Sequence, residues 1–282
     1  MKVLLTGATG FIGGAVLQAL LQHGHQVRAV VRGEKSAEAA SGLGAETAVG
    51  DIADGGWLSG QLAGADGAIH LALLEPAGDD VVLDAVFSAF QGSAKPFVYT
   101  SGLWVFGNNA DITEDSPLQP TDISVWRLPR AKRVLGSGLR ASVIAPAPVY
   151  GHGRGLAAWL FSYGPRTEDG ALRLVGSGTQ HWASVHVEDL AELYVAALER
   201  APGGELYIGA SGVNPTVREM GLAAVGPDGT VVAEDDDATR ARLGAGLADA
   251  LLLDQQAAGA RARARLDWQP SRRSVLDELG AR

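Results

Sequence analysis

The sequence predicts an α/β fold in which a doubly wound parallel sheet is followed by a small C-terminal lobe. Short apolar runs typical of buried strands alternate with segments of helical periodicity over the first 150 residues. A glycine-rich turn separates the first apolar run from the first helical segment, and the alternation becomes less regular after residue 151. Strands that alternate with helices form parallel sheets covered on both faces, so we expect this architecture for the N-terminal part.

The expected elements follow in order along the chain. The first strand, residues 3–5, is entirely apolar, and residues 11–23 then place apolar side chains at helical spacing until Gly24 ends the helix. Residues 188–200 form a clear amphipathic helix. The other expected strands are residues 27–31, 49–52, 67–72, 97–100 and 141–145, the other expected helices are residues 79–90 and 123–137, and residues 221–265 are helices of the lobe.

Composition limits the class of protein. The 282 residues suffice for one large or two modest domains, and 46% hydrophobic with 20% charged residues is typical of a globular chain. The net charge of -9 argues against nucleic acids and anionic membranes as partners. The absence of Cys excludes disulfides, thiol nucleophiles and Cys-type zinc sites, and the six His show no paired spacing, so we expect no metal.

The N-terminus does not have the pattern of a signal peptide. Met1 and Lys2 precede apolar residues, but the apolar run is broken at residues 6–10. No other stretch reaches the ~18 uninterrupted apolar residues of a transmembrane helix. We therefore expect a cytoplasmic protein that does not associate with membranes.

The glycine-rich turn has the spacing and the setting of a dinucleotide-binding fingerprint. Gly7 allows the tight turn, Gly10 lets backbone N–H groups approach the pyrophosphate, and Gly13 lets the helix pack closely on the sheet. The helix N-terminus adds a charge of ~+0.5 facing the phosphates. The alternative is a glycine-rich turn without a ligand, but strand, turn and helix all agree with a binding site. The residues of this fingerprint are Thr6-Gly7-Ala8-Thr9-Gly10-Phe11-Ile12-Gly13.

The second strand indicates which dinucleotide binds. NAD-binding proteins place an acidic residue ~20 positions after the fingerprint to bond the ribose 2′-hydroxyl. Here Arg32 occupies the end of that strand and no acidic residue does. Since a guanidinium can pair with the 2′-phosphate of NADP, we expect NADP(H), with NAD(H) less favoured; an ordinary surface Arg is the alternative. Asp51 and Ile52, at the end of the third strand, are expected to lie beside the adenine. The alternative is that they belong to a loop that does not contact the cofactor.

These residues and further motifs resemble the extended short-chain dehydrogenase/reductases, the NAD-dependent epimerase/dehydratase group. The resemblance spans nearly the whole chain. It implies a Rossmann-type fold, a cofactor site that also includes Leu71, Ala72 and Thr100, and a homodimer formed through the two helices beside the catalytic strand. The further motifs are Gly50-Asp51-Ile52, His70-Leu71-Ala72, Val98-Tyr99-Thr100-Ser101, Val105-Phe106-Gly107, Pro148-Val149-Tyr150-Gly151, Val185-His186-Val187-Glu188-Asp189-Leu190 and Leu266-Asp267-Trp268-Gln269-Pro270.

Pattern and resemblance together divide the chain into two units. Residues 1–150 and 179–200 are expected to form the dinucleotide-binding Rossmann domain. Residues 151–178 and 201–282 are expected to form the smaller lobe that binds a small-molecule substrate.

The catalytic residues that the resemblance implies are missing at the matching positions. The family has a Ser or Thr that orients the substrate oxygen, and a Tyr acid/base with a Lys in a Y-x-x-x-K helix. Counting back from Gly107 places Gly102 at the hydroxyl position, and the helix best matches Trp126 for Tyr and Arg130 for Lys. Tryptophan cannot act as a general acid or base, and that loss typically costs about 10²–10⁴-fold. Arg130 is expected to hold the nicotinamide ribose and to keep a positive field near the ring.

Other residues are candidates for the missing proton donor. Ser101 lies one position from Gly102, so a register slip would supply the hydroxyl; otherwise it caps backbone at the strand end. Tyr150 and His152 follow the last strand, at the carboxyl edge of the sheet where such folds bind ligands. An imidazole titrates near ~6.5 and can donate a proton, the alternative being a merely exposed loop His. Arg127 points either to solvent or to an anionic substrate group.

Four tryptophans fall in segments expected to border the substrate cleft. Trp104, Trp126, Trp159 and Trp182 would suit a flat or apolar substrate, the alternative being core packing. We therefore predict an NADP(H)-dependent oxidoreductase acting by hydride transfer on a small aromatic or apolar molecule, such as an iminium, enone or quinone-like acceptor. The alternatives are a non-catalytic NADP(H)-binding sensor or scaffold, and a redox-neutral epimerase- or dehydratase-like enzyme.

Overall fold

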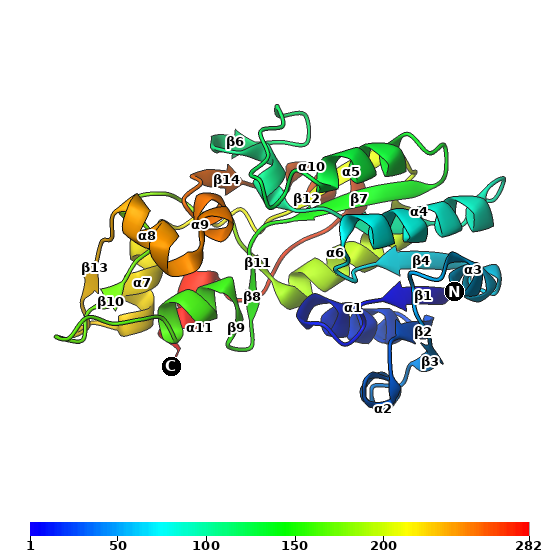
Figure 1. Ribbon diagram of the computed structural model, residues 1–282, viewed down its shortest axis with the longest axis horizontal. Coiled ribbons are helices and arrows are strands. Elements are labelled where there is room, and N and C mark those ends of the chain that lie inside the picture. The colour runs from blue at the N-terminus through cyan, green and yellow to red at the C-terminus, as the bar shows by residue number, and fades with distance from the viewer. Residues whose placement is uncertain (282) are drawn as a thin grey trace.

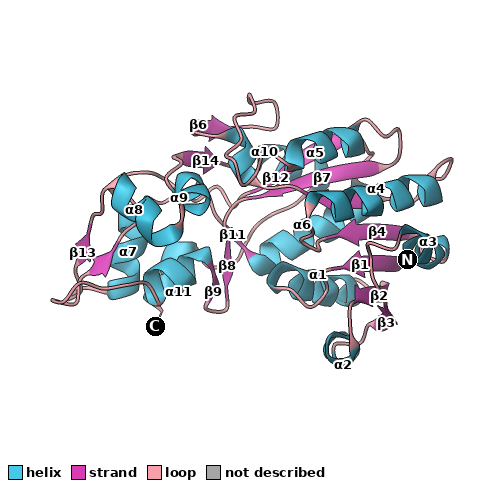
Figure 2. Cartoon of the chain, in the orientation of Figure 1, coloured by secondary structure: helices cyan, strands magenta, loops and turns pink. Residues whose placement is uncertain are grey.

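The computed structural model describes residues 1–281 and shows a large sheet domain beside a smaller lobe (Figure 1). The large unit is built on a seven-stranded parallel sheet with the order β12-β7-β5-β4-β1-β2-β3 (Figure 2). The strand order reverses between β1 and β4, which is the switch point of a doubly wound sheet, so the predicted fold class is confirmed. The strands are β1 (Lys2–Thr6), β2 (Gln26–Val31), β3 (Glu46–Val49), β4 (Gly67–His70), β5 (Phe97–Thr100), β7 (Ala141–Pro146) and β12 (Glu205–Gly209).

Helices cover both faces of this sheet. Val3 and Leu5 of β1 belong to the buried cluster on one face, whereas Leu4 between them belongs to the cluster on the other. Both faces are buried, which is why the strands are continuous apolar runs in the sequence. The first face carries α1 (Phe11–Gln22), α2 (Glu34–Gly42), α6 (Val187–Arg200) and α10 (Ala260–Leu266), and the second carries α3 (Gly55–Ala63), α4 (Pro76–Phe90) and α5 (Arg127–Leu135).

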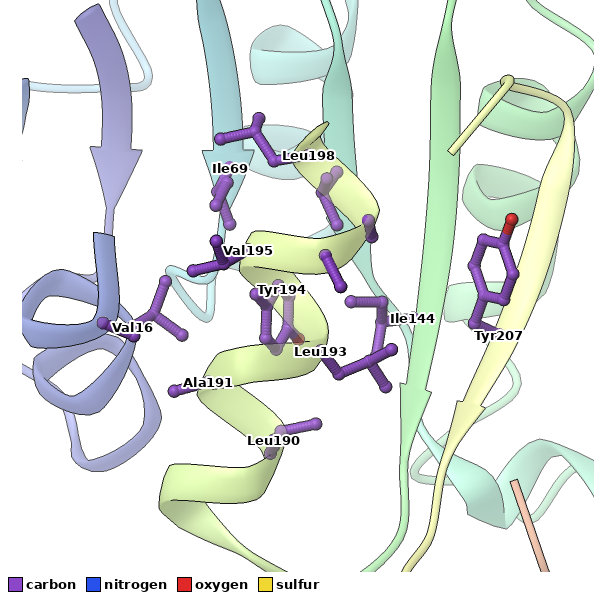
Figure 3. Packing of buried hydrophobic residues seen from close by; sticks show 14 of the residues in the cluster. Val16, Ile69, Ile144, Leu190, Ala191, Leu193, Tyr194, Val195, Leu198 and Tyr207 are labelled. Atoms are coloured by element: carbon purple, nitrogen blue, oxygen red, sulfur yellow. The ribbon is translucent and has the colours of Figure 1, made fainter. Parts of the chain in front are cut away.

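The centre of the larger core lies around α6. Ten of the 14 residues of this helix are buried, so it is a core helix rather than a surface one. Figure 3 shows Leu190, Tyr194 and Leu198 of α6 lying between Val16 of α1 and Ile144 of β7. The predicted helix over residues 188–200 is confirmed, with its start one residue earlier.

The expected boundary of the lobe needs correction in two places. Trp182 lies in the buried cluster of the lobe, and residues 185–186 pair with residues 149–150, although residues 179–200 are expected in the Rossmann domain. Residues 205–209 pair in parallel with β7 over five positions and form an edge of the large sheet. The following α10 packs on β12 and α6, and its Ala262 and Leu266 join the core under α6. These segments therefore belong to the Rossmann domain and not to the lobe. A five-residue strand behind the Gly203-Gly204 turn has too little periodicity to be separated from a loop by its sequence.

The smaller lobe has a buried cluster of its own. Phe161, Leu172, Trp182 and Met220 are among its members. No helix within residues 1–281 is both long and apolar enough to cross a bilayer. The lobe contains β8 (Val149–Gly151), β9 (Arg154–Gly155), the π-helical turn η2 (Ala158–Ser162), β10 (Leu172–Arg173), β11 (Val185–His186), α7 (Val217–Val225), β13 (Val231–Val232), α8 (Asp236–Leu243), α9 (Ala245–Leu251) and α11 (Val275–Gly280). Beside the sheet domain lie the 3-10 turn η1 (Leu103–Phe106) and the paired strands β6 (Asn109–Ile112) and β14 (Gln255–Ala257).

The C-terminal segment connects the two units through Asp189 of α6. The indole nitrogen of Trp268 donates to the backbone carbonyl of Asp189 over 2.7 Å. The buried carboxylate of Asp189 accepts the backbone N–H groups of Ser271 and Arg272, each at 3.0 Å. Immediately afterwards α11 packs against α7 in the lobe. Asp189 thus fixes the C-terminal segment to α6, through both its backbone and its side chain, where the chain crosses between the domains.

Candidate active site

The glycine loop after β1 has no room for side chains. Gly7 has a φ of +75°, and a Cβ there would lie 2.8 Å from the backbone nitrogen of Ala72. A Cβ on Gly13 would lie 1.9 Å from the carbonyl oxygen of Gly7. Gly10 is the N-cap of α1 and supplies no side-chain cap, which leaves the first-turn N–H groups available to a ligand. This close-packed cradle fits the pyrophosphate of a dinucleotide.

A cleft of about 300 Å³ runs from this loop across the ends of β2 and β4. Its lining includes half of the residues predicted to bind the cofactor: Gly7, Thr9, Gly10, Arg32, Ile52, Leu71 and Ala72. Arg32 is exposed there and forms no ion pair with any residue from 1 to 281, so its guanidinium is free for a ligand. Ser36 of α2 lines the cleft beside it.

Two predicted cofactor residues turn their side chains elsewhere. The carboxylate of Asp51 accepts the N–H of Ala53 at 2.9 Å in a local turn, whereas Ile52 next to it lines the cleft. The hydroxyl of Thr100 bonds the carbonyl of His70 and the hydroxyl of Tyr194, each at 2.8 Å. Thr100 therefore supports the strand end from within the protein.

Thr6 supports the floor of the cleft rather than lining it. Its hydroxyl oxygen accepts the N–H groups of Leu71 and Ala72 at 3.1 and 3.2 Å. Two accepted bonds leave the hydroxyl hydrogen to be donated to Nδ1 of His70, 2.7 Å away. His70 must then donate from Nε2 to Asp79, 2.9 Å away. The loop that follows β4 is thus anchored to α4 by a buried chain of hydrogen bonds.

Asp79 ends this chain. Its second carboxylate oxygen accepts the hydroxyl of Tyr99 at 2.5 Å. Burial opposes the charged form, but the bonds from His70 and Tyr99 prevail and lower the pKa of Asp79 below its usual value. Burial and the nearby Asp79 charge raise the pKa of Tyr99, as expected for a core residue. Tyr99 is therefore a structural residue and not an acid/base.

A second cleft, of about 430 Å³, lies beyond the end of β5 and is largely apolar. Of the four tryptophans expected at its border, Trp104 and Trp126 line it. Trp182 is buried in the lobe, where it donates to the carbonyl of Leu251, and Trp159 is half exposed on η2. The other lining residues are Leu73, Ser101, Gly102, Leu103, Ile123, Ser124, Arg127, Pro146, Ala147, Pro148, Val149 and Leu156.

The comparisons with known proteins agree with this geometry. Residues 3–209 match the NAD dependent epimerase/dehydratase family. The chain belongs to this family. An uncharacterised protein of Schizosaccharomyces pombe is 27% identical over 300 residues, which cover 100% of this chain and 99% of that protein. The 4-hydroxy-2-methyl-3-oxo-4-farnesyl-3,4-dihydroquinoline-1-oxide ketoreductase of Stigmatella aurantiaca is 26% identical over 242 residues, covering 78% of this chain and 71% of the relative.

Solved structures show the same fold. The dTDP-glucose 4,6-dehydratase of Bacillus anthracis in complex with NAD superposes with a TM-score of 0.77 at 18% identity. The superposition covers 100% of this chain and 94% of that chain. Members of the epimerase/dehydratase family bind NAD(P), and the cradle and cleft described above fit such a cofactor.

The structure corrects the expected match to the family's Y-x-x-x-K helix. Arg130 is buried and points to α4, where it binds the carboxylate of Asp80 and the carbonyl of Pro76. Its donors are thus taken up beside α4, and Arg130 lines neither the cofactor cleft nor the apolar cleft. Arg127 instead lines the apolar cleft, and its Nη1 donates to the carbonyl of Thr100 at 3.1 Å. The guanidinium at the site is therefore that of Arg127.

This shift of three positions brings Ile123 to the Tyr position of the Y-x-x-x-K spacing. Ile123 lines the cleft, and it has no titratable group. Trp126 also lines the cleft, with its indole nitrogen donating to the carbonyl of Ile123 at 3.1 Å. The helix begins only at Arg127, after turns, rather than at residue 123 as expected. The sequence contains no Tyr between Thr100 and Val149, so neither register supplies the family's phenol.

The two remaining acid/base candidates lie outside the apolar cleft. Tyr150 is buried, and its hydroxyl donates to the carbonyl of Arg273 at 2.7 Å; burial raises its pKa. The Nε2 of His152 lies 2.9 Å from a carboxylate oxygen of Glu188, in a separate hollow beside the glycine loop. Of the residues proposed to donate a proton, only Ser101 lines the cleft.

Proposed function

We propose that this protein is an NADP(H)-dependent oxidoreductase that acts on a small aromatic or apolar molecule without the usual Ser-Tyr-Lys set. One observation carries the proposal: Leu73 lines both the cofactor cleft and the apolar cleft, and it is 77% exposed. A dinucleotide with its adenosine near Arg32 and its pyrophosphate over Gly10 would extend its nicotinamide toward this junction. A ligand in the apolar cleft would then meet the reactive ring.

The choice of NADP(H) rests on the end of β2. Arg32 has no acidic partner within residues 1–281, and its strand ends at the cleft without the carboxylate that would bond a ribose 2′-hydroxyl. A guanidinium with free donors matches the geometry of a phosphate, and Ser36 adds a hydroxyl. These features support binding of the 2′-phosphate of NADP.

The choice of substrate class rests on the lining of the apolar cleft. Trp104 and Trp126 provide aromatic surface. Within the described residues 1–281, Arg127 is the one charged residue that lines this cleft. Such a cleft suits a flat or apolar molecule that carries one polar or anionic group. The ketoreductase of Stigmatella aurantiaca, whose name describes a farnesylated quinoline substrate, supports the same class.

Bound NADPH would supply a hydride at the junction, and the residues of the cleft determine which acceptors can use it. The guanidinium of Arg127 stays charged and can stabilise negative charge on the acceptor, but it cannot release a proton. Ser101 offers a hydroxyl group in the cleft, whereas the hydroxyl of Ser124 already donates to the carbonyl of Thr121 at 3.1 Å. Acceptors that neutralise or delocalise the charge, such as an iminium, enone or quinone-like ring, therefore fit best, with water as the source of any proton.

Titration of the tryptophan fluorescence with NADPH and NADH tests the proposal. We expect tighter binding of NADPH, and Arg32→Ala should weaken NADPH at least about tenfold, or about 1.4 kcal/mol, with little change for NADH. Arg28→Ala is the matched control, because Arg28 lies on the same strand and pairs with Glu46 instead of lining the cleft. A clear preference for NADH would refute the cofactor assignment.

A turnover assay then separates the enzyme from the non-catalytic alternative. We expect oxidation of NADPH with iminium or enone acceptors and not with simple unconjugated ketones. The missing phenol also favours a sensor or scaffold that binds the cofactor without turnover. Tight NADPH binding with no turnover across the acceptor panel would support that second function and refute the oxidoreductase.

A further inference from the structure

A hairpin of the small lobe reaches the start of α1. Strands β8 and β9 pair antiparallel, with Gly151 opposite Arg154, at the junction of the two units (Figure 1). The guanidinium carbon of Arg154 lies 4.9 Å from the centroid of the Phe11 ring, a cation–π distance. Phe11 is the first residue of α1 and belongs to the glycine fingerprint. A charged residue of the lobe thus stands beside the expected pyrophosphate site.

The hollow that contains Arg154 adjoins the cofactor cleft. It has a volume of about 290 Å³, and Thr9, Gly10, Phe11 and Arg154 are among its lining residues. Thr9 and Gly10 line the cofactor cleft as well. A dinucleotide that crosses the glycine loop therefore passes the mouth of this hollow, within reach of a flexible Arg side chain.

The charges around the hollow leave Arg154 without an acidic partner. Glu188, which also lines it, is paired with His152 at 2.9 Å and with Arg272 at 3.0 Å. Arg154 itself forms no ion pair within the described part of the chain, positions 1–281. Its positive charge lies beside the positive end of the α1 dipole, an arrangement that an anion between them would stabilise.

The backbone of the hairpin holds Arg154 in this place. His152 adopts a φ of +53°, which is costly for a residue other than Gly, and its Nε2 lies 2.9 Å from a carboxylate oxygen of Glu188. The N–H of Gly153 is bonded to the carboxylate of Glu278 at 3.0 Å. Arg154 follows directly and is exposed, so its side chain is free to rotate toward a ligand while its backbone stays fixed.

We propose that Arg154 is a cofactor-binding residue supplied by the small lobe, and that its guanidinium contacts the pyrophosphate of the bound dinucleotide. This inference rests on the proposed function, because it requires a dinucleotide over the glycine loop. It assigns to the lobe a part in binding the cofactor as well as the substrate. Since NADP(H) and NAD(H) share the pyrophosphate, the contact affects both equally and is independent of the contact made by Arg32.

The test compares Arg154→Ala, Arg154→Lys and wild type by fluorescence titration with NADPH, NADH and adenosine 2′-monophosphate, which has no pyrophosphate. Arg154→Ala should weaken NADPH and NADH by the same factor, about tenfold, and leave adenosine 2′-monophosphate unchanged. Arg154→Lys should recover part of the loss. Arg173→Ala is the control, because it removes an exposed guanidinium from β10, away from the glycine loop.

Three other outcomes are possible, and each refutes one part of the proposal. A loss for NADPH alone would place Arg154 at the 2′-phosphate and refute the pyrophosphate contact, and unchanged affinities would refute any contact. Failure of the wild type to bind either dinucleotide would refute the proposed function itself. Thermal unfolding of each variant checks the fold; we expect unchanged midpoints, because the Arg154 side chain is exposed.

Discussion

Replacement of Gly13 by Ala is the most direct test of the cofactor cradle. The Cβ of the new residue would lie 1.9 Å from the carbonyl oxygen of Gly7, whereas real Cβ contacts essentially never fall below 3.0 Å. The loop must therefore move by about 1 Å away from α1. Overpacking of this kind costs about 1–3 kcal/mol, and for a chain of this size about 2 kcal/mol lowers the unfolding midpoint by roughly 4–8 °C.

The same movement displaces the N–H groups that would bind the pyrophosphate. Loss of two charge-assisted hydrogen bonds, at about 1.5 kcal/mol each, corresponds to a roughly hundredfold weaker dinucleotide affinity. Gly14→Ala is the matched control on the next residue of the same helix. A Cβ at Gly14 meets its nearest atom, the carbonyl oxygen of Ala8, at 3.8 Å, which is an ordinary contact.

Fluorescence titration with NADPH and thermal unfolding measure both effects. We expect Gly14→Ala to bind NADPH like the wild type and to gain about 0.5–1 kcal/mol of stability from its better helix propensity. Normal NADPH binding by Gly13→Ala would refute the cradle. An equal loss of NADPH affinity in both variants would show that the substitutions disturb the helix as a whole and not its contact with the loop.

Two further predictions concern catalysis and pH. The double variant Ile123→Tyr/Arg127→Lys places a Y-x-x-x-K pair in the cleft and should raise the rate of NADPH-dependent reduction of simple ketones at least about tenfold. The control Trp126→Tyr/Arg130→Lys should leave that rate unchanged. Equal rates in the two double variants would contradict the placement of Arg127 at the Lys position. Asp79→Asn should lower the free energy of unfolding by about 2 kcal/mol at pH 7, because two donors then share one acceptor. The folded-state pKa of Asp79 is lowered, so its contribution is present above the unfolded value near ~4 and is lost as pH falls through the folded value. Urea unfolding should therefore show the difference from wild type shrinking below about pH 4, and a constant difference down to about pH 2 would refute this role.

The cofactor cradle could be predicted because its evidence is local. Gly7, Gly10 and Gly13 lie within seven residues, between a strand and a helix whose periodicities are plain. Arg32 follows from the end of the next strand in the same way. The family motifs, spread over the chain, identified the fold because many short patterns agreed.

The catalytic helix could not be placed by the same means. Arg127 and Arg130 are three positions apart and therefore lie near the same face of a helix. Spacing alone cannot decide which of them occupies the Lys position of the family's Y-x-x-x-K helix. The choice is made by Asp80 on α4, which binds Arg130 from 50 positions away. The partner of Tyr150 could not be foreseen for a similar reason, since the acceptor of its hydroxyl, the carbonyl of Arg273, is 123 positions distant.

The connection through Asp189 has a consequence for the nascent chain. Its carboxylate is buried within α6, but the N–H of Ser271 that it accepts is synthesised 82 residues later. At about 5–20 residues per second, this leaves an interval of roughly 4–16 s in which the acceptor exists without its donor. During that time the lobe also lacks α11, and the apolar surface of α7 that α11 covers is open to solvent. We therefore expect ribosome-bound chains that stop before residue 268 to bind chaperones that recognise exposed apolar surface, and chains extended past α11 to release them.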